Sequence, residues 1–318
     1  MNRSLQHPSE TTSNGVPDHR TALVLAGAGA AGNAWQLGLI AGLSDAGVDI
    51  TDADLVIGTS AGSTGAAQIT SGRPSAELYA AVLAEAPPAE APGGPGRGGA
   101  PGRSGAESMT WSDGIIGAAL DASDMRRRLG AAALERDTPD DAGPTRWRRI
   151  VAARLPGLDW PQQRVLITAV DARTGEPAVF DRRSGVGLID AVAASTSNPF
   201  GGTYPIGSHR YINGGYRRSE NADLASGYGR VLVLSPFGGA SRMPPAWGMD
   251  LATQVAELRA AGSRVETVFP DDGAGDVFDA NALDPSTRPQ AARGGHAQGR
   301  ALAARLGPFW RAGDQDPT

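Results

Sequence analysis

The sequence predicts an α/β fold built on a mostly parallel β-sheet. Short apolar runs of strand length alternate along the 318-residue chain with segments of helical periodicity, a pattern typical of a sheet covered by helices. Two of the apolar runs, 21–26 and 55–59, lead directly into glycine-rich turns and then into helices. The chain is long enough to bury a large core, and 40% of its residues are hydrophobic.

The predicted elements follow one another from residue 21 to residue 306. Apolar runs predict strands at 21–26, 55–59, 164–171, 178–181, 209–213, 230–235 and 264–269. Helical patterns occupy 33–46, 62–70, 124–134, 146–155, 187–195, 249–261 and 290–306. In the first of these helices, one face carries Trp35, Leu39, Ile40 and Leu43, and Pro156 stops the helix at 146–155.

Three segments fall outside this alternation and set the domain boundaries. Residues 1–20 are rich in Ser, Thr, Asn and Pro, and we expect a disordered tail there. From about residue 86 to 108 the density of Pro and Gly excludes a helix or a central strand. We interpret this stretch as an insert within one domain at 21–306, and residues 307–318 as a second tail.

Composition excludes several classes of function. The net charge of −5 and the absence of a basic stripe disfavour nucleic acid as a partner. There is no Cys for a disulfide, a thiol nucleophile or a thiolate metal site, and the four His residues lie far apart, so we expect no metal. The first residues lack the apolar core of a signal peptide, which predicts a cytoplasmic protein and leaves peripheral membrane contact open. No motif indicates a protein partner.

A glycine loop follows the first predicted strand. The segment Gly27–Gly32 reads Gly-Ala-Gly-Ala-Ala-Gly, which is the G-x-G-x-x-G spacing of a dinucleotide site. That site also needs an acid at the end of the next strand, where this chain has only Thr59 and Ser60. The loop has two other interpretations. It is either a turn that packs a helix on a strand, or an oxyanion hole whose backbone N–H groups meet at a helix N-terminus.

A serine motif follows the second predicted strand. The segment Gly58–Gly62 reads Gly-Thr-Ser-Ala-Gly, with Ser60 at its centre. Its place between an apolar strand and a helix of small residues indicates a nucleophile elbow, in which the serine hydroxyl projects over the end of the sheet. Ser60 could instead only cap that helix. His296, the only late His, would be the base of an α/β-hydrolase, but no strand immediately precedes it.

These motifs, with a third one, resemble the patatin-like phospholipase family of serine acyl hydrolases. The third motif is Tyr211–Gly215, followed by Asn221–Ala225, and the segment Ala191–Ser195 before it is also similar to the family. The resemblance covers about residues 21–240 and implies a three-layer α/β fold. It also implies a Ser–Asp dyad without a catalytic His, a lipid or ester substrate, and no metal or organic cofactor.

The resemblance assigns a role to each motif. Ser60 would attack the ester carbonyl, and the backbone N–H groups of Ala28, Gly29 and Ala61 would hold the oxyanion. Residue 213 would orient Ser60 and take its proton. The motif glycines that shape these loops would be Gly27, Gly32, Gly58, Gly62, Gly214 and Gly215.

Two positions depart from the family pattern. The family often has an Arg where this glycine loop has Ala31. The dyad Asp is replaced by Asn213, and a neutral amide cannot accept the serine proton as a carboxylate does. In a serine-protease triad, exchange of Asp for Asn costs about 10⁴ in rate.

Three explanations for Asn213 stay open. The residue is natural in a nearly inactive protein that keeps its pocket for binding, or it is an introduced substitution that traps a substrate complex. Otherwise another acid is the base, and the nearest candidates are Asp171, Glu220 and Asp223. His209 needs a bend to act, because residues four apart on a strand lie ~13 Å from each other. We expect a weakened hydrolase, with a catalytically inactive lipid-binding protein as the alternative.

Overall fold

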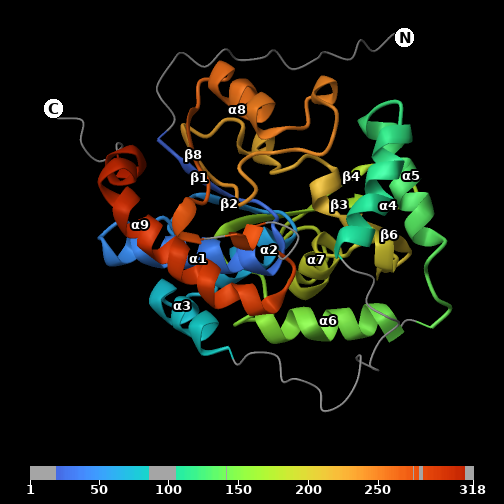
Figure 1. Cartoon of the computed structure of the whole chain (residues 1–318), viewed down its shortest axis with the longest axis horizontal. Coiled ribbons are helices and arrows are strands. Elements are labelled where there is room, and N and C mark those ends of the chain that lie inside the picture. Colours follow the sequence, from blue (N-terminus) through green and yellow to red (C-terminus); the bar gives the residue numbers. More distant parts are fainter. Residues whose placement is uncertain (1–18, 86–104, 141, 275, 279–281, 312–318) are drawn as a thin grey trace, which may run out of the picture.

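The computed structural model describes residues 19–85, 105–140, 142–274, 276–278 and 282–311 (Figure 1). They form one eight-stranded sheet with the order β5-β6-β3-β2-β1-β7-β8, in which β4 also pairs with β3. The strands are β1 (Thr21–Leu25), β2 (Leu55–Gly58), β3 (Arg164–Asp171), β4 (Pro177–Phe180), β5 (Tyr204–Ile206), β6 (His209–Asn213), β7 (Arg230–Leu234) and β8 (Arg264–Val268).

The centre of the sheet is parallel and the β6 side is antiparallel. Strands β3, β2, β1, β7 and β8 run in the same direction, whereas β6 and β4 pair antiparallel with β3. Strands β1, β2 and β7 are buried at every position, as expected for parallel strands that helices cover on both faces. The mostly parallel α/β sheet predicted from the sequence is therefore confirmed.

Helices cover both faces of the sheet. They are α1 (Gly29–Asp45), α2 (Ala61–Ile69), α3 (Ser75–Ala84), α4 (Gly105–Ala118), α5 (Ala122–Leu134), α6 (Ala142–Arg154), α7 (Leu188–Ser195), α8 (Leu251–Ala260) and α9 (Arg288–Arg311). Figure 1 shows α8 on one face and α1, α2, α7 and α9 on the other, with α3 and α6 farther out.

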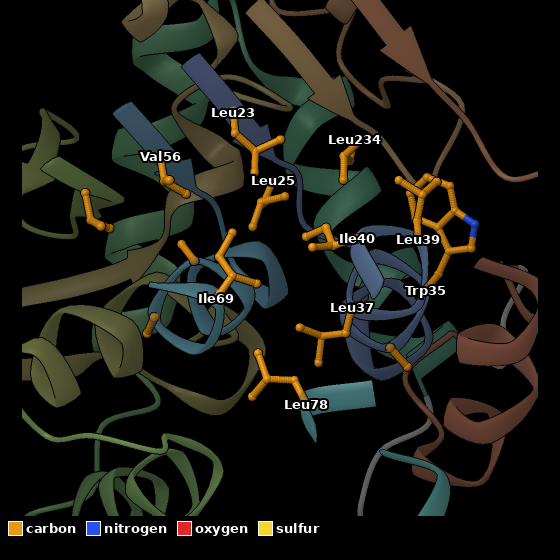
Figure 2. Close-up of a cluster of buried hydrophobic side chains, with 14 of the residues drawn as sticks. Leu23, Leu25, Trp35, Leu37, Leu39, Ile40, Val56, Ile69, Leu78 and Leu234 are labelled. Atoms are coloured by element: carbon orange, nitrogen blue, oxygen red, sulfur yellow. The ribbon is translucent and has the colours of Figure 1, made fainter. Parts of the chain in front are cut away.

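The main core lies between the sheet and the α1 face. Leucine and valine side chains of β1 and β2 point toward α1 and α2, and Leu78 reaches in from α3 (Figure 2). Trp35 faces α9, where its Nε1 donates to Gln298 Oε1 over 3.0 Å. A second core, under α8, includes Val24, Ile57 and Val233 from the opposite face of the same strands. Both faces of β1 and β2 are therefore buried, and the Gly27–Gly32 loop and the Ser60 turn follow these two strands.

Several boundaries differ from the sequence prediction. Helix α1 begins four residues earlier, inside the glycine loop, and α9 continues through Arg311 into the predicted tail. Helices α3 and α4 and strand β5 were not predicted; α3 buries only Leu78 and Val82, too few positions to give a clear period. Helix α4 starts at Gly105, within the predicted insert. The rest of that insert, at 86–104, lies outside the described residues, as do 1–18 and 312–318.

No helix in the described part of the chain is long and apolar enough to cross a bilayer.

Candidate active site

Ser60 occupies a strained turn between β2 and α2. Its φ of 52° and ψ of −123° lie in a region that residues other than glycine rarely adopt, which is the backbone signature of a nucleophile elbow. Ser60 occupies the N-cap position of α2, but its side chain makes no capping hydrogen bond to the helix, so the interpretation of Ser60 as a helix cap holds for the backbone only. Gly62 lies so close to the end of β1 that a Cβ there would overlap the Leu25 carbonyl oxygen.

Asn213, at the end of β6, lies directly against Ser60. Its Nδ2 donates to Ser60 Oγ over 2.9 Å, and its Oδ1 accepts from the backbone N–H of Gly215, also over 2.9 Å. The Gly215 N–H needs an acceptor, so it fixes which end of the amide faces the serine. The geometry of a dyad is thus present, but the group that faces Ser60 is a donor and cannot take its proton.

A buried asparagine joins the elbow to the Asn213 loop. Asn221, in a left-handed conformation, directs its Nδ2 at the Thr59 hydroxyl over 2.9 Å and at the Gly214 carbonyl over 3.1 Å. The sequence placed Asn221 in the third family motif but did not reveal this role. Buried hydrogen bonds from a side-chain amide hold two loops in one geometry, because breaking them leaves polar groups unpaired.

Ser195 supports the elbow from another element. Its side chain is fully buried at the end of α7, and its Oγ accepts the backbone N–H of Ser60 over 3.0 Å. This hydrogen bond gives the Ser60 N–H an acceptor, because the backbone of the turn directs that N–H away from the sheet. It was not predicted from the sequence, where only the similarity of Ala191–Ser195 to the family was noted.

The glycine loop lies beside Ser60. A Cβ built on Gly27 would be 2.7 Å from the Ser60 Cβ, which shows how closely the two turns approach. The backbone N–H groups of Ala28, Gly29 and Ala61 find no acceptor among the described residues. They lie at the N-termini of α1 and α2, where the helix dipole favours negative charge. The hydrogen-bonding capacity of these N–H groups is therefore unused within the described ranges.

Two of the other candidate bases are bound to each other instead of to Ser60. The His209 Nδ1 lies 2.9 Å from Asp171 Oδ2. Burial would raise the pKa of Asp171, but the hydrogen bond from His209 and the backbone N–H groups of Thr174 and Arg173 outweigh it and hold that pKa below its ordinary value. Neither side chain has a hydrogen bond to Ser60.

The remaining candidates for the base also bind other residues and not Ser60. Asp223 forms a two-point ion pair with Arg217, with contacts of 2.9 and 2.7 Å. Burial raises the pKa of Glu220, which is 3% exposed and accepts from Ser235 Oγ over 2.9 Å. His296 pairs with Asp45 at the far end of α1. Among the described residues, Asn213 is therefore the only side chain with a hydrogen bond to Ser60 Oγ.

No group of three or more His, Cys, Asp or Glu side chains suited to a metal occurs within the described ranges. Trp35, considered from the sequence as a possible lining of an acyl pocket, is fully buried in the core.

A model of the patatin-like phospholipase family matches residues 23–226, more than half of the chain. The chain belongs to the patatin-like phospholipase family. The matched region contains the glycine loop, Ser60 and Asn213, and the family resemblance drawn from the sequence is confirmed. Membership supports ester hydrolysis in lipids as the general chemistry of this patatin-like chain. No curated protein matches it.

Two solved structures are similar to this patatin-like chain. VipD from Legionella pneumophila is 12% identical with a TM-score of 0.42, and the match covers 91% of this chain and 67% of VipD. The type III effector protein ExoU is 14% identical with a TM-score of 0.33, and the match covers 89% of this chain. The chain spans about half the length of ExoU, with 54% of that protein covered.

Proposed function

We propose that this protein is a serine acyl hydrolase that acts on carboxylic esters of lipids, and that Asn213 holds its activity at a low level. The observation that carries the proposal is the contact between Ser60 and Asn213. The strained turn, the free N–H groups and the family support a nucleophile at Ser60. The donor at Asn213 Nδ2 supports weak activity, because it occupies one lone pair of Ser60 Oγ and cannot accept the hydroxyl proton during attack.

The reaction would follow the path of acyl transfer to a serine. Ser60 Oγ attacks the ester carbonyl, and the negative oxygen of the tetrahedral intermediate accepts hydrogen bonds from Ala28, Gly29 and Ala61. A carboxylate at position 213 would accept the Oγ proton during attack. With Asn213 that proton goes to solvent, so the step loses general-base catalysis, which contributes typically about 10²–10⁴-fold.

Three proteins test this proposal in one assay with a short p-nitrophenyl ester: the unchanged chain, Ser60→Ala and Asn213→Asp. We expect slow turnover by the unchanged chain, none by Ser60→Ala, and fast turnover by Asn213→Asp. Equal turnover by the unchanged chain and Ser60→Ala would overturn the assignment of the nucleophile. Phospholipid vesicles as the second substrate then separate a phospholipase from a general esterase.

A catalytically inactive lipid-binding protein is the second candidate, and the same Ser60–Asn213 contact favours it. It predicts that the unchanged chain turns over no ester at all but binds an acyl ester measurably. Binding of a non-hydrolysable ether analogue by calorimetry, together with no product after prolonged incubation, would decide for this candidate.

A further inference from the structure

A cavity of about 440 Å³ opens where α3 and α6 pack below α1 and the start of α9. Its size falls within the roughly 300–1,000 Å³ typical of small-molecule sites. The cavity is separate from Ser60, which does not line it. From α2 and α6 it is lined by residues near their C-terminal ends, and from α1 by residues of the first turns, where the glycine loop also lies. Nothing in the catalytic scheme above uses this cavity.

Three arginines line the cavity, and two of them have carboxylate partners. Arg288 holds Glu85 through two bonds of 2.6 and 3.0 Å and donates to Asn33 Oδ1 over 2.9 Å. Arg73, just before α3, lies 3.5 Å from Glu77 in the first turn of that helix. The charges of these two side chains are therefore compensated within the protein.

Arg154, the third arginine, has no such partner. Its guanidinium has neither an ion pair nor a hydrogen-bond acceptor among the described residues, and its nearest ring is Trp147, 5.8 Å from the ring centroid. Arg154 is exposed at the mouth of the cavity. Burial by the surrounding protein atoms and the charge of Arg288 lower its pKa, and the charge of Glu85 opposes them to a smaller extent. A cation without a direct carboxylate contact in a partly desolvated wall attracts an anion more strongly than one in open water.

Apolar side chains also line the cavity. Leu78 and Val82 of α3 and Leu155, which follows α6, are 2–8% exposed, and Pro156 is exposed. One cation without a carboxylate contact, in a cavity with apolar lining residues, matches a ligand with one negative charge and a hydrocarbon tail. A phosphate dianion matches it less well, because the other two arginines are already paired.

We infer that this cavity binds a fatty acid, with the carboxylate on Arg154 and the alkyl chain along the wall formed by Leu78, Val82, Leu155 and Pro156. Binding here involves no turnover, so the inference stands apart from the proposed hydrolysis. It gives the chain a second lipid site, on the side of α1 opposite its contact with the sheet.

Calorimetry with dodecanoate tests the inference, on the full chain carrying Ser60→Ala so that no acyl-enzyme forms. We expect Arg154→Gln to weaken binding at least tenfold, which corresponds to about 1.4 kcal/mol. Arg149→Gln is the matched control: it removes an exposed arginine of the same helix that does not line the cavity, and should leave affinity unchanged. Thermal melting of each variant checks that it is folded.

Two further measurements separate this site from others. Ala81 is exposed and lines the cavity, so Ala81→Trp should block dodecanoate without disturbing the core. Dodecanol, with the same chain and no charge, should bind at least tenfold more weakly. Equal affinity of dodecanoate for all the variants would place the fatty acid elsewhere, and stronger binding of inorganic phosphate than of dodecanoate would make this a phosphate site; either result overturns the inference.

Discussion

The two ends of the Asn213 side-chain amide bind different groups, the Gly215 N–H and the Ser60 hydroxyl. The Gly215 N–H takes Oδ1, so Nδ2 is left to face Ser60 Oγ at 2.9 Å. An aspartate in the same rotamer would keep the bond to Gly215 and turn its second oxygen toward the serine hydroxyl. One change of atom, from nitrogen to oxygen, thus reverses the direction of the hydrogen bond at the nucleophile.

Asn213→Asp should therefore raise the rate of ester hydrolysis by about 10³–10⁴-fold, with little change in the affinity for substrate. The expected signature is a rise in kcat with KM nearly constant, measured with a p-nitrophenyl ester. The pH profile should gain an acidic limb, because the introduced carboxylate must be ionised to act as a base. Adding Ser60→Ala to this variant should abolish the gain, and a gain that survives would place the nucleophile elsewhere.

Ser195→Ala should destabilise the turn at Ser60. It removes the acceptor of the Ser60 N–H in a fully buried position, so we expect a loss of about 1–3 kcal/mol in the free energy of unfolding. In the Asn213→Asp background kcat should also fall, because the nucleophile loses its fixed orientation.

Ser71→Ala is the matched control for this variant. Ser71 donates to the Gln68 carbonyl at the opposite end of α2, so its loss should leave kcat unchanged. If Ser195→Ala and Ser71→Ala had the same kcat, the bond between Ser195 and Ser60 would have no positioning role.

Local patterns explain which parts of this site the sequence could predict. The buried strand, the small residues around Ser60 and the glycine loop are contiguous, so the Ser60 turn and the neighbouring Gly27–Gly32 loop could both be inferred from adjacent residues. The parallel order of β1 and β2 follows from the same alternation and places the two loops at one edge of the sheet.

The contacts that hold the site are not local and could not be predicted in this way. Asn221 reaches Thr59 across 162 positions, and Ser195 reaches Ser60 across 135. The direction of the Asn213 amide depends on the N–H of Gly215, which becomes visible only once the turn after β6 is folded. Helix α3 was missed for a related reason, because tertiary packing of Leu78 and Val82 stabilises it more than its own sequence pattern does.

Gly62→Ala should destabilise the protein by about 1–3 kcal/mol or more, since the new methyl group overlaps the Leu25 carbonyl and either β1 or α2 must move. Activity in the Asn213→Asp background should fall with it. Gly114→Ala is the opposite case. It lies on α4 with no atom within 4 Å of a Cβ, so the change should stabilise the helix by about 0.5–1 kcal/mol. Chemical denaturation of both variants checks the pair, and a neutral Gly62→Ala would contradict the close packing of β1 on α2.

The last prediction concerns the buried carboxyl of Glu220. Burial raises its pKa above the ordinary 4.5, so between pH 4.5 and the raised value the folded state holds a proton that the unfolded state has released. The free energy of unfolding must then decrease as pH rises through that range. Glu220→Gln keeps an acceptor for Ser235 Oγ and has no proton to lose, so its stability should change less with pH there.

Urea denaturation at several pH values measures this difference. Asp250 should have the opposite pH dependence. The hydrogen bond from the Thr253 N–H lowers the pKa of Asp250, so the stability that its carboxylate contributes is lost as pH falls. Asp250→Asn should therefore lose less stability than the unchanged protein at low pH. If the natural protein and Glu220→Gln had parallel curves above pH 4.5, Glu220 would be ionised in the fold like an ordinary surface carboxyl.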